Sequence, residues 1–233
     1  MGTKSRDSAP HVRCGTEGIM CGGSWGVGGP VRRQVRYSVH PSVEYGRRVL
    51  ENLPVKTGRS LDEWIDLLGA DGPGGETERR NWLREEHALG GTTARMIAER
   101  SVGKGLDNSD PKGYLRAAED YIEGMYGGGR AALRPLHDAL LELSVSLGQV
   151  CPCETIVPLY QKHVFAEIKP ATSSRIDFGL ARKGTSKRPP KRLLETGGLA
   201  KGDRITHRFA LRHLHQVDGT VERWLAVAYD LDD

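Results

Sequence analysis

The residues best suited to chemistry fall between Lys169 and Arg212, where twelve basic side chains accompany only three acidic ones. Alternating residue patterns predict that Arg175 and Asp177 share the outward face of one strand, and Arg208 and Arg212 that of another. These side chains either bind an anion or pair with each other across the strands as a solvated surface. The loop between the two strands contributes five further cations, Lys183, Lys187, Arg188, Lys191 and Arg192.

Other reactive residue types lack the partners that catalysis or metal binding requires. A nucleophile elbow and a complete phosphate-binding loop are both absent from the sequence. His213 and His215 could supply two metal ligands from one strand face, but no third ligand is evident, so two surface histidines are the simpler interpretation. Cys151 and Cys153 lie on one face of an extended segment, which suits core packing or a redox or metal role. We therefore expect no catalytic residue, metal or cofactor, and lean against an enzyme.

The net charge of +4 is unevenly distributed along the 233 residues. Residues 1–42 are glycine-rich and basic, without apolar periodicity, and are predicted to be a disordered tail. Residues 43–129 have four more acidic than basic side chains, and residues 130–233 have four more basic than acidic ones. This asymmetry suggests different partners or a contact between the two parts. The sequence contains neither a run of eighteen apolar residues nor a secretory signal, which predicts a cytoplasmic protein with no membrane contact.

The first part reads as a series of short helices. The segment from Pro41 is predicted to be helical up to Pro54. Ser60 and Glu63 have the spacing of a capping box, with Trp64 on the apolar face that follows. The next helix, over about 76–87, presents Trp82 to the same core and is expected to end at the glycines 90 and 91, with His87 capping its C-terminus. Asp110 and Pro111 then begin another helix.

After a leucine-rich helix that ends at Gly148, the apolar period changes from 3.6 to 2. A short apolar run over 156–160 and alternating residues over 164–169, 175–180 and 205–212 predict antiparallel strands, with a further short strand near Leu193. A last helix is expected over about 217–229. The fold class is therefore α+β. Its predicted parts are a small all-helical N-terminal module (43–126), a glycine hinge (127–129), and a domain (130–230) in which two helices pack an antiparallel sheet.

Particular segments resemble two bacterial families of unknown function. Residues 56–64 (KTGRSLDEW) and 82–90 (WLREEHALG) resemble DUF4287, over about 43–101. Five segments resemble DUF5655, over about 130–230: 133–136 (LRPL), 165–170 (FAEIKP), 175–180 (RIDFGL), 205–208 (ITHR) and 224–229 (WLAVAY). The resemblance implies a tandem of the two domains and an α+β fold for the second half. The resemblance implies no activity. Relatives of the second domain occur beside restriction-like modules, which suggests a role with nucleic acid.

Three functions follow from these observations. The first is a non-enzymatic module that contacts a polyanion such as nucleic acid through its basic sheet face and loop. The second is a small-molecule-binding or enzymatic domain with a site on the sheet face around Arg175, Asp177 and Arg208. The third is a protein-interaction adaptor in which the acidic module contacts the basic domain. A deep pocket beside those three residues would favour the second function, and a flat basic surface the first.

Overall fold

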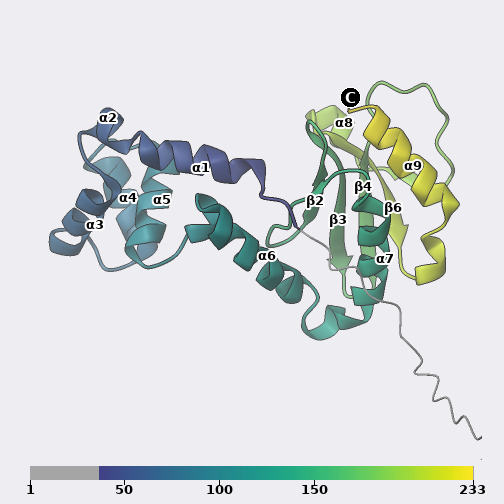
Figure 1. The fold of residues 1–233 in the computed structure, drawn as a ribbon, viewed down its shortest axis with the longest axis horizontal. Helices are drawn as coiled ribbons and strands as arrows, with labels where there is room; N and C mark the ends of the chain where they lie inside the picture. The colour runs from purple at the N-terminus through teal and green to yellow at the C-terminus, as the bar shows by residue number, and fades with distance from the viewer. Residues whose placement is uncertain (1–36, 233) are drawn as a thin grey trace, which may run out of the picture. The chain divides into compact units, whose positions relative to one another are not determined.

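The helical part of the chain is built from short helices joined by tight turns (Figure 1). The computed structural model describes residues 37–232. The first six helical segments are α1 (Pro41–Glu51), α2 (Leu53–Thr57), α3 (Leu61–Ala70), α4 (Glu76–Glu85), α5 (Gly91–Ser101) and the 3₁₀ turn η1 (Leu106–Asn108). The predicted helix ends before Pro54, as α1 stops at Glu51. Pro54 itself lies in the first turn of a second helix, α2. The predicted capping box at Ser60 and Glu63 is confirmed, with both reciprocal hydrogen bonds formed.

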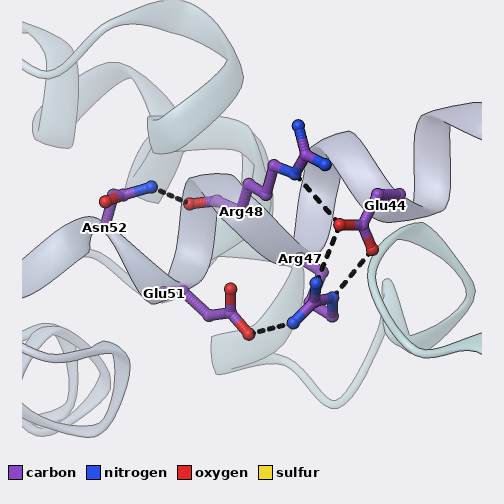
Figure 2. A network of polar contacts seen from close by, with 5 residues as sticks. All are labelled: Glu44, Arg47, Arg48, Glu51 and Asn52. Carbon is purple, nitrogen blue, oxygen red and sulfur yellow. Dashed lines mark hydrogen bonds and ion pairs between the residues drawn. The ribbon is translucent and has the colours of Figure 1, made fainter.

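An ion network covers the exposed side of α1 (Figure 2). Glu44 accepts hydrogen bonds from Arg47 and Arg48, one turn along the helix, and Arg47 also pairs with Glu51. Hydrogen bonds from both arginines lower the pKa of Glu44 to about 2. Exposed pairs of this kind contribute little individually, so the network supports α1 locally and does not determine the fold.

The two tryptophans share a core, as predicted. Trp64 is buried with Leu68 and Leu83, and Trp82 packs at the edge of the same cluster. His87 lies between the two indoles, with ring centroids 5.1 Å from Trp64 and 4.4 Å from Trp82. Its ring is therefore part of this aromatic contact, whereas the sequence predicted a cation capping the helix terminus.

Helix α6 (Pro111–Met125) connects the short helices to the part of the chain that contains the sheet (Figure 1). Asp110 caps α6 as predicted, and the helix ends just before the triple glycine. The glycines lead into the 3₁₀ segment η2 (Gly128–Leu133) and then α7 (Arg134–Ser144). Ile122, Met125 and Tyr126 are buried in the same core as α7 and the sheet. The end of α6 thus packs with the α+β part of the chain.

An antiparallel sheet follows, with six strands in the described residues in the order β1-β2-β3-β4-β6-β5. The strands are β1 (Gln149–Val150), β2 (Val157–Tyr160), β3 (Val164–Thr172), β4 (Arg175–Ala181), β5 (Leu193–Glu195) and β6 (Ile205–Leu211). A one-turn helix α8 (Gly198–Lys201) precedes β6, and α9 (Gly219–Asp230) closes the described structure. The prediction of an α+β fold with helices followed by an antiparallel sheet is confirmed.

Helices α7 and α9 cover one face of this sheet (Figure 1). Phe178 of β4 lies opposite Ile168 of β3 and Phe209 of β6, and this row is buried against both helices. Neighbouring residues point to the opposite face because side chains alternate along a strand. That opposite face, which we call the open face, carries the charged residues of β3, β4 and β6.

The described part of the chain begins with residues that contact the α+β part. Ser38 N–H donates a 2.8 Å hydrogen bond to the carbonyl of Val150, and His40 Nε2 lies 2.9 Å from the Tyr160 hydroxyl. His40 also accepts from Ser42 N–H as the N-cap of α1. Residues 37–42 were predicted to end a disordered tail, and these contacts correct that boundary. Residues 1–36, with Cys14 and Cys21, lie outside the described structure. Over residues 37–232, no helix is long and apolar enough to cross a membrane.

Candidate functional site

Two rows of facing residues form the centre of the open face. In the first row, Glu167 of β3 lies opposite Gly179 of β4, which lies opposite Arg208 of β6. In the second row, one pleat along, Lys169 lies opposite Asp177. This register brings acidic and basic side chains from three strands to one place.

Asp177 lies between two arginines. Arg175 forms an ion pair with its carboxylate, with Nε 2.9 Å from Oδ1, and donates a 3.4 Å hydrogen bond from Nη2 to Oδ2, which also pairs with Arg208. The Asp177 side chain is 11% exposed, and the two arginine side chains are 25% and 35% exposed. The prediction that these three residues share a face therefore holds geometrically. The face is not uniformly basic, because the carboxylate counters both guanidinium groups.

Gly179 makes room for the side chain of Glu167. A Cβ atom at position 179 would lie 2.8 Å from Glu167 Cγ and 2.6 Å from Ile205 Cγ2. Both distances are below any normal contact, so the carboxyl-bearing side chain of Glu167 lies across the glycine. Burial raises the pKa of Glu167, Lys169 lowers it, and Asp203 and Asp177 raise it further, with a net increase. Glu167 therefore keeps its proton to a higher pH than an ordinary glutamate does.

The open face is hollowed above these residues into a pocket of about 490 Å³. Its charged lining residues are Glu167, Lys169, Asp177, Asp203, Arg204 and Arg208. The volume falls within the usual range for small-molecule sites. The floor is the sheet itself, and the segment between β5 and β6 forms one side.

Arg204 is held at that side by Asp232, two residues after the end of α9. Its guanidinium pairs with the buried carboxylate of Asp232, and its Nε donates to the carbonyl of Val164 at 3.3 Å. Asp232 also accepts the backbone N–H of His163 at 2.7 Å. Arg204 and Asp203 also line a second pocket of about 350 Å³, together with Lys183 and Asp232. The Arg204–Asp232 pair thus lies where the two pockets adjoin.

The predicted loop cations do not behave as one group. The side chains of Lys183, Lys187, Arg188 and Lys191 are exposed and form no ion pair or hydrogen bond within residues 37–232. Arg192 differs, because it pairs with Asp218 and lies over the ring of Phe209 at 5.2 Å. Arg182 holds the start of the loop through the ring of Trp224 and the carbonyl of Lys187.

The remaining residues singled out from the sequence lie away from the pocket. Arg212 donates to the Ser174 hydroxyl at 3.0 Å, at the β3–β4 turn. His213 and His215 stack with ring centroids 5.5 Å apart. Cys151 is buried and Cys153 half-buried, both as free thiols. Burial raises the pKa of both thiols, that of Cys151 to about 12, so neither is activated as a nucleophile.

Two family models match separate segments of the chain. A model described as a domain of unknown function (DUF4287) matches residues 46–100, and another described as a domain of unknown function (DUF5655) matches residues 122–232. The chain carries a DUF4287 domain followed by a DUF5655 domain. No curated protein and no solved structure matches it.

The open-face pocket lies within the DUF5655 match, and the sequence revealed only part of it. Asp177 and Arg208 were predicted as site residues, whereas Glu167, Lys169, Asp203 and Arg204 were not. Glu167 and Lys169 stand at alternate positions of a predicted strand, which placed them on a common face. The missing information was the strand register, because only the pairing of β3 with β4 places Glu167 over Gly179.

Proposed function

We propose that the DUF5655 domain binds a small polar molecule in the open-face pocket. The observation that carries this proposal is a hollow of about 490 Å³ whose lining includes three charged groups without an ion-pair partner among the described residues. Lys169 Nζ and the carboxyl groups of Glu167 and Asp203 form no ion pair or side-chain hydrogen bond within residues 37–232. Polar groups converging in a concave site are what a small ligand requires for orientation.

The same contacts weaken the case for a polyanion on the sheet face. Asp177 holds Arg175 and Arg208, and Asp232 holds Arg204, so none of these guanidinium groups is fully free for phosphate. A phosphate bound there would compete with a carboxylate already in place. The hollow lies beside two of the three residues that the sequence analysis named for a small-molecule site, Asp177 and Arg208.

A ligand screen on the full chain tests this proposal. We expect polar compounds to shift the backbone amide NMR signals of Glu167, Gly179 and Arg208. Replacing Gly179 with Ala places a methyl group against Glu167 Cγ, so Gly179→Ala should weaken binding at least tenfold. Gly124→Ala is the matched control, because a Cβ there meets no neighbour. Ligands that bind both variants equally, or that shift only residues 183–191, would contradict the proposal.

The loop supports a second candidate function, binding of a polyanion such as nucleic acid. Four cations, Lys183, Lys187, Arg188 and Lys191, are exposed on a connection held at its two ends by Arg182 and Arg192. Such side chains act through charge, by releasing counterions from the polyanion. This candidate rests on the loop alone and does not use the open face.

Salt dependence distinguishes charge-driven binding from other modes. Changing the four loop cations to Gln should make the slope of log affinity against log salt shallower by up to about 3.6 for duplex DNA. The matched control changes four exposed cations of the helical part to Gln: Lys56, Arg84, Lys112 and Arg116. Equal effects of the two sets would show nonspecific attraction, and no binding of DNA or RNA even at low salt would reject this function.

A further inference from the structure

The unpaired charges of the open-face pocket are of both signs. Lys169 contributes one ammonium group, and Glu167 and Asp203 contribute two carboxyl groups. The other charged residues of the lining already have protein partners: Arg208 pairs with Asp177, and Arg204 pairs with Asp232. A ligand with a single charge would satisfy one sign and leave the other unpaired.

Lys169 and Asp203 lie at different ends of the hollow. Lys169 projects from the same face of β3 as Glu167, two residues away, which corresponds to about 7 Å along the strand. Asp203 lies in the segment that leads from α8 into β6, on the side formed by Arg204 and Ile205. Glu167 lies between them over Gly179, close enough to Asp203 for that carboxylate to raise its pKa. The arrangement is Lys169 at one end, Glu167 in the middle within reach of both charges, and Asp203 at the other end.

From this arrangement we infer that the ligand is a zwitterionic small molecule such as an amino acid, with its carboxylate at Lys169 and its ammonium group between Glu167 and Asp203. The inference rests on the proposed function, since it names the ligand class for the same pocket.

The environment of Glu167 agrees with a cationic group arriving from the ligand. Burial disfavours its charged form, and Asp203 and Asp177 oppose it, while Lys169 alone favours it. A ligand ammonium group beside Glu167 would supply the missing opposite charge and stabilise the carboxylate. The two carboxyl groups would then accept the N–H donors of the ammonium group, leaving Lys169 free for the ligand's anionic end.

Titration of the full chain with matched probes tests the inference. The probes are glycine, β-alanine and 4-aminobutyrate, each compared with the carboxylate and the amine of the same chain length. We expect at least one amino acid to bind tenfold or more tightly than both of its singly charged analogues. Lys169→Met should reduce its affinity to that of the amine, and the pair Glu167→Gln with Asp203→Asn to that of the carboxylate. Lys201→Met and Glu222→Gln, both exposed and outside the pocket, are the controls.

The outcomes separate this inference from the proposed function. If a carboxylate or an amine binds in the pocket as tightly as the amino acid, the ligand class is wrong and the pocket remains a small-molecule site. If the amino acid binds but Lys169→Met and the paired Glu167→Gln, Asp203→Asn variant both retain its affinity, the assigned contacts are wrong. If neither these probes nor the compounds of the wider screen perturb the pocket, both the inference and the proposed function fail. Melting curves of each variant establish that it is folded.

Discussion

His137 is a fully buried ionisable residue in the core of the α+β part, and its position makes stability depend on pH. Its Nδ1 lies 2.9 Å from the Tyr126 hydroxyl, and its Nε2 has no hydrogen-bond partner among the described residues. Burial, with a smaller contribution from Arg134, lowers the pKa of His137 to about 3. The folded protein therefore keeps this ring neutral at a pH where an unfolded chain would protonate it.

We predict that His137 makes the unfolding free energy decrease as the pH falls below about 6.5, the ordinary histidine pKa. Between pH 6.5 and 3 the unfolded chain takes up the proton and the folded chain does not, so the unfolding free energy falls by up to about 1.4 kcal/mol per pH unit. Urea unfolding at pH 7, 6 and 5 should show this loss in the native chain and a smaller one in His137→Gln. Exposed His215→Gln is the control, and parallel pH curves for the native and His137→Gln chains would contradict the prediction.

At the same scale, the sequence predicted which charged residues share a face better than it predicted their ion-pair partners. The alternation of β4 and β6 placed Arg175, Asp177 and Arg208 on one face, and the structure brings them together. The sequence left anion binding and pairing across the strands open, and the structure shows Asp177 paired with both arginines, with a diagonal contact to Arg208, 31 residues away. The sequence grouped Arg192 with the loop cations, and the structure adds its ion pair with Asp218, at the start of α9, which the sequence did not indicate.

At the scale of elements, the turn after helix α4 contains a residue that is poorly suited to its backbone, three positions after the helix ends at Glu85. Ala88 has a φ angle of 52°, in the left-handed region, and the next residue, Leu89, donates its N–H to the carbonyl of Leu83 at 3.1 Å. The sequence predicted that Gly90 or Gly91 would fill this role. Instead Gly90 is the N-cap of α5, with a φ angle of −62°. The chain therefore turns earlier than its glycines suggest.

Ala88→Gly should stabilise the protein by about 0.5–1 kcal/mol. A left-handed backbone costs a residue with a Cβ about 1–2 kcal/mol, and glycine's greater freedom in the unfolded chain cancels part of that gain. Thermal or urea unfolding of the full chain measures the change. Ala117→Gly, in the middle of α6, is the opposite control and should destabilise by about 1 kcal/mol. A destabilised Ala88→Gly protein would show that the methyl group makes a contact worth more than the backbone strain.

The elements that the sequence predicted well are those determined locally. Ser60 and Glu63 cap α3 because their bonds span three residues, and Asp110 with Pro111 begins α6 for the same reason. The strands β3, β4 and β6 follow from alternation over six or more residues, and β2 follows from a short apolar run. The two-residue β1 and the four-residue α8 are too short to leave a periodic signal, and their existence depends on pairing with β2 and on the approach to β6.

At the scale of the whole molecule, the residues just before α1 connect sequence segments more than a hundred positions apart. Ser38 bonds to Val150 and His40 to Tyr160, and Tyr37 packs at the edge of the α+β core. Tyr114 of α6 donates its hydroxyl to the carbonyl of Pro152 at 2.7 Å, close to the same place. These contacts are long-range in sequence and have no periodic pattern, which explains why the segment was assigned to a tail. The folded part therefore includes residues outside both family matches.

Removal of residues 37–42 should therefore destabilise the protein. Compared with a chain that starts at residue 37, one that starts at residue 43 loses the Ser38 and His40 hydrogen bonds and the packing of Tyr37 and Val39. Two hydrogen bonds at about 1 kcal/mol each, together with partly buried side chains, predict a loss of at least about 2 kcal/mol in unfolding free energy. A double-mutant cycle between His40→Ala and Tyr160→Phe should give a coupling of about 0.5–1.5 kcal/mol, which isolates one of these contacts from the change in chain length. Equal stability of the two chains, with no coupling in the cycle, would return residues 37–42 to the tail that the sequence first suggested.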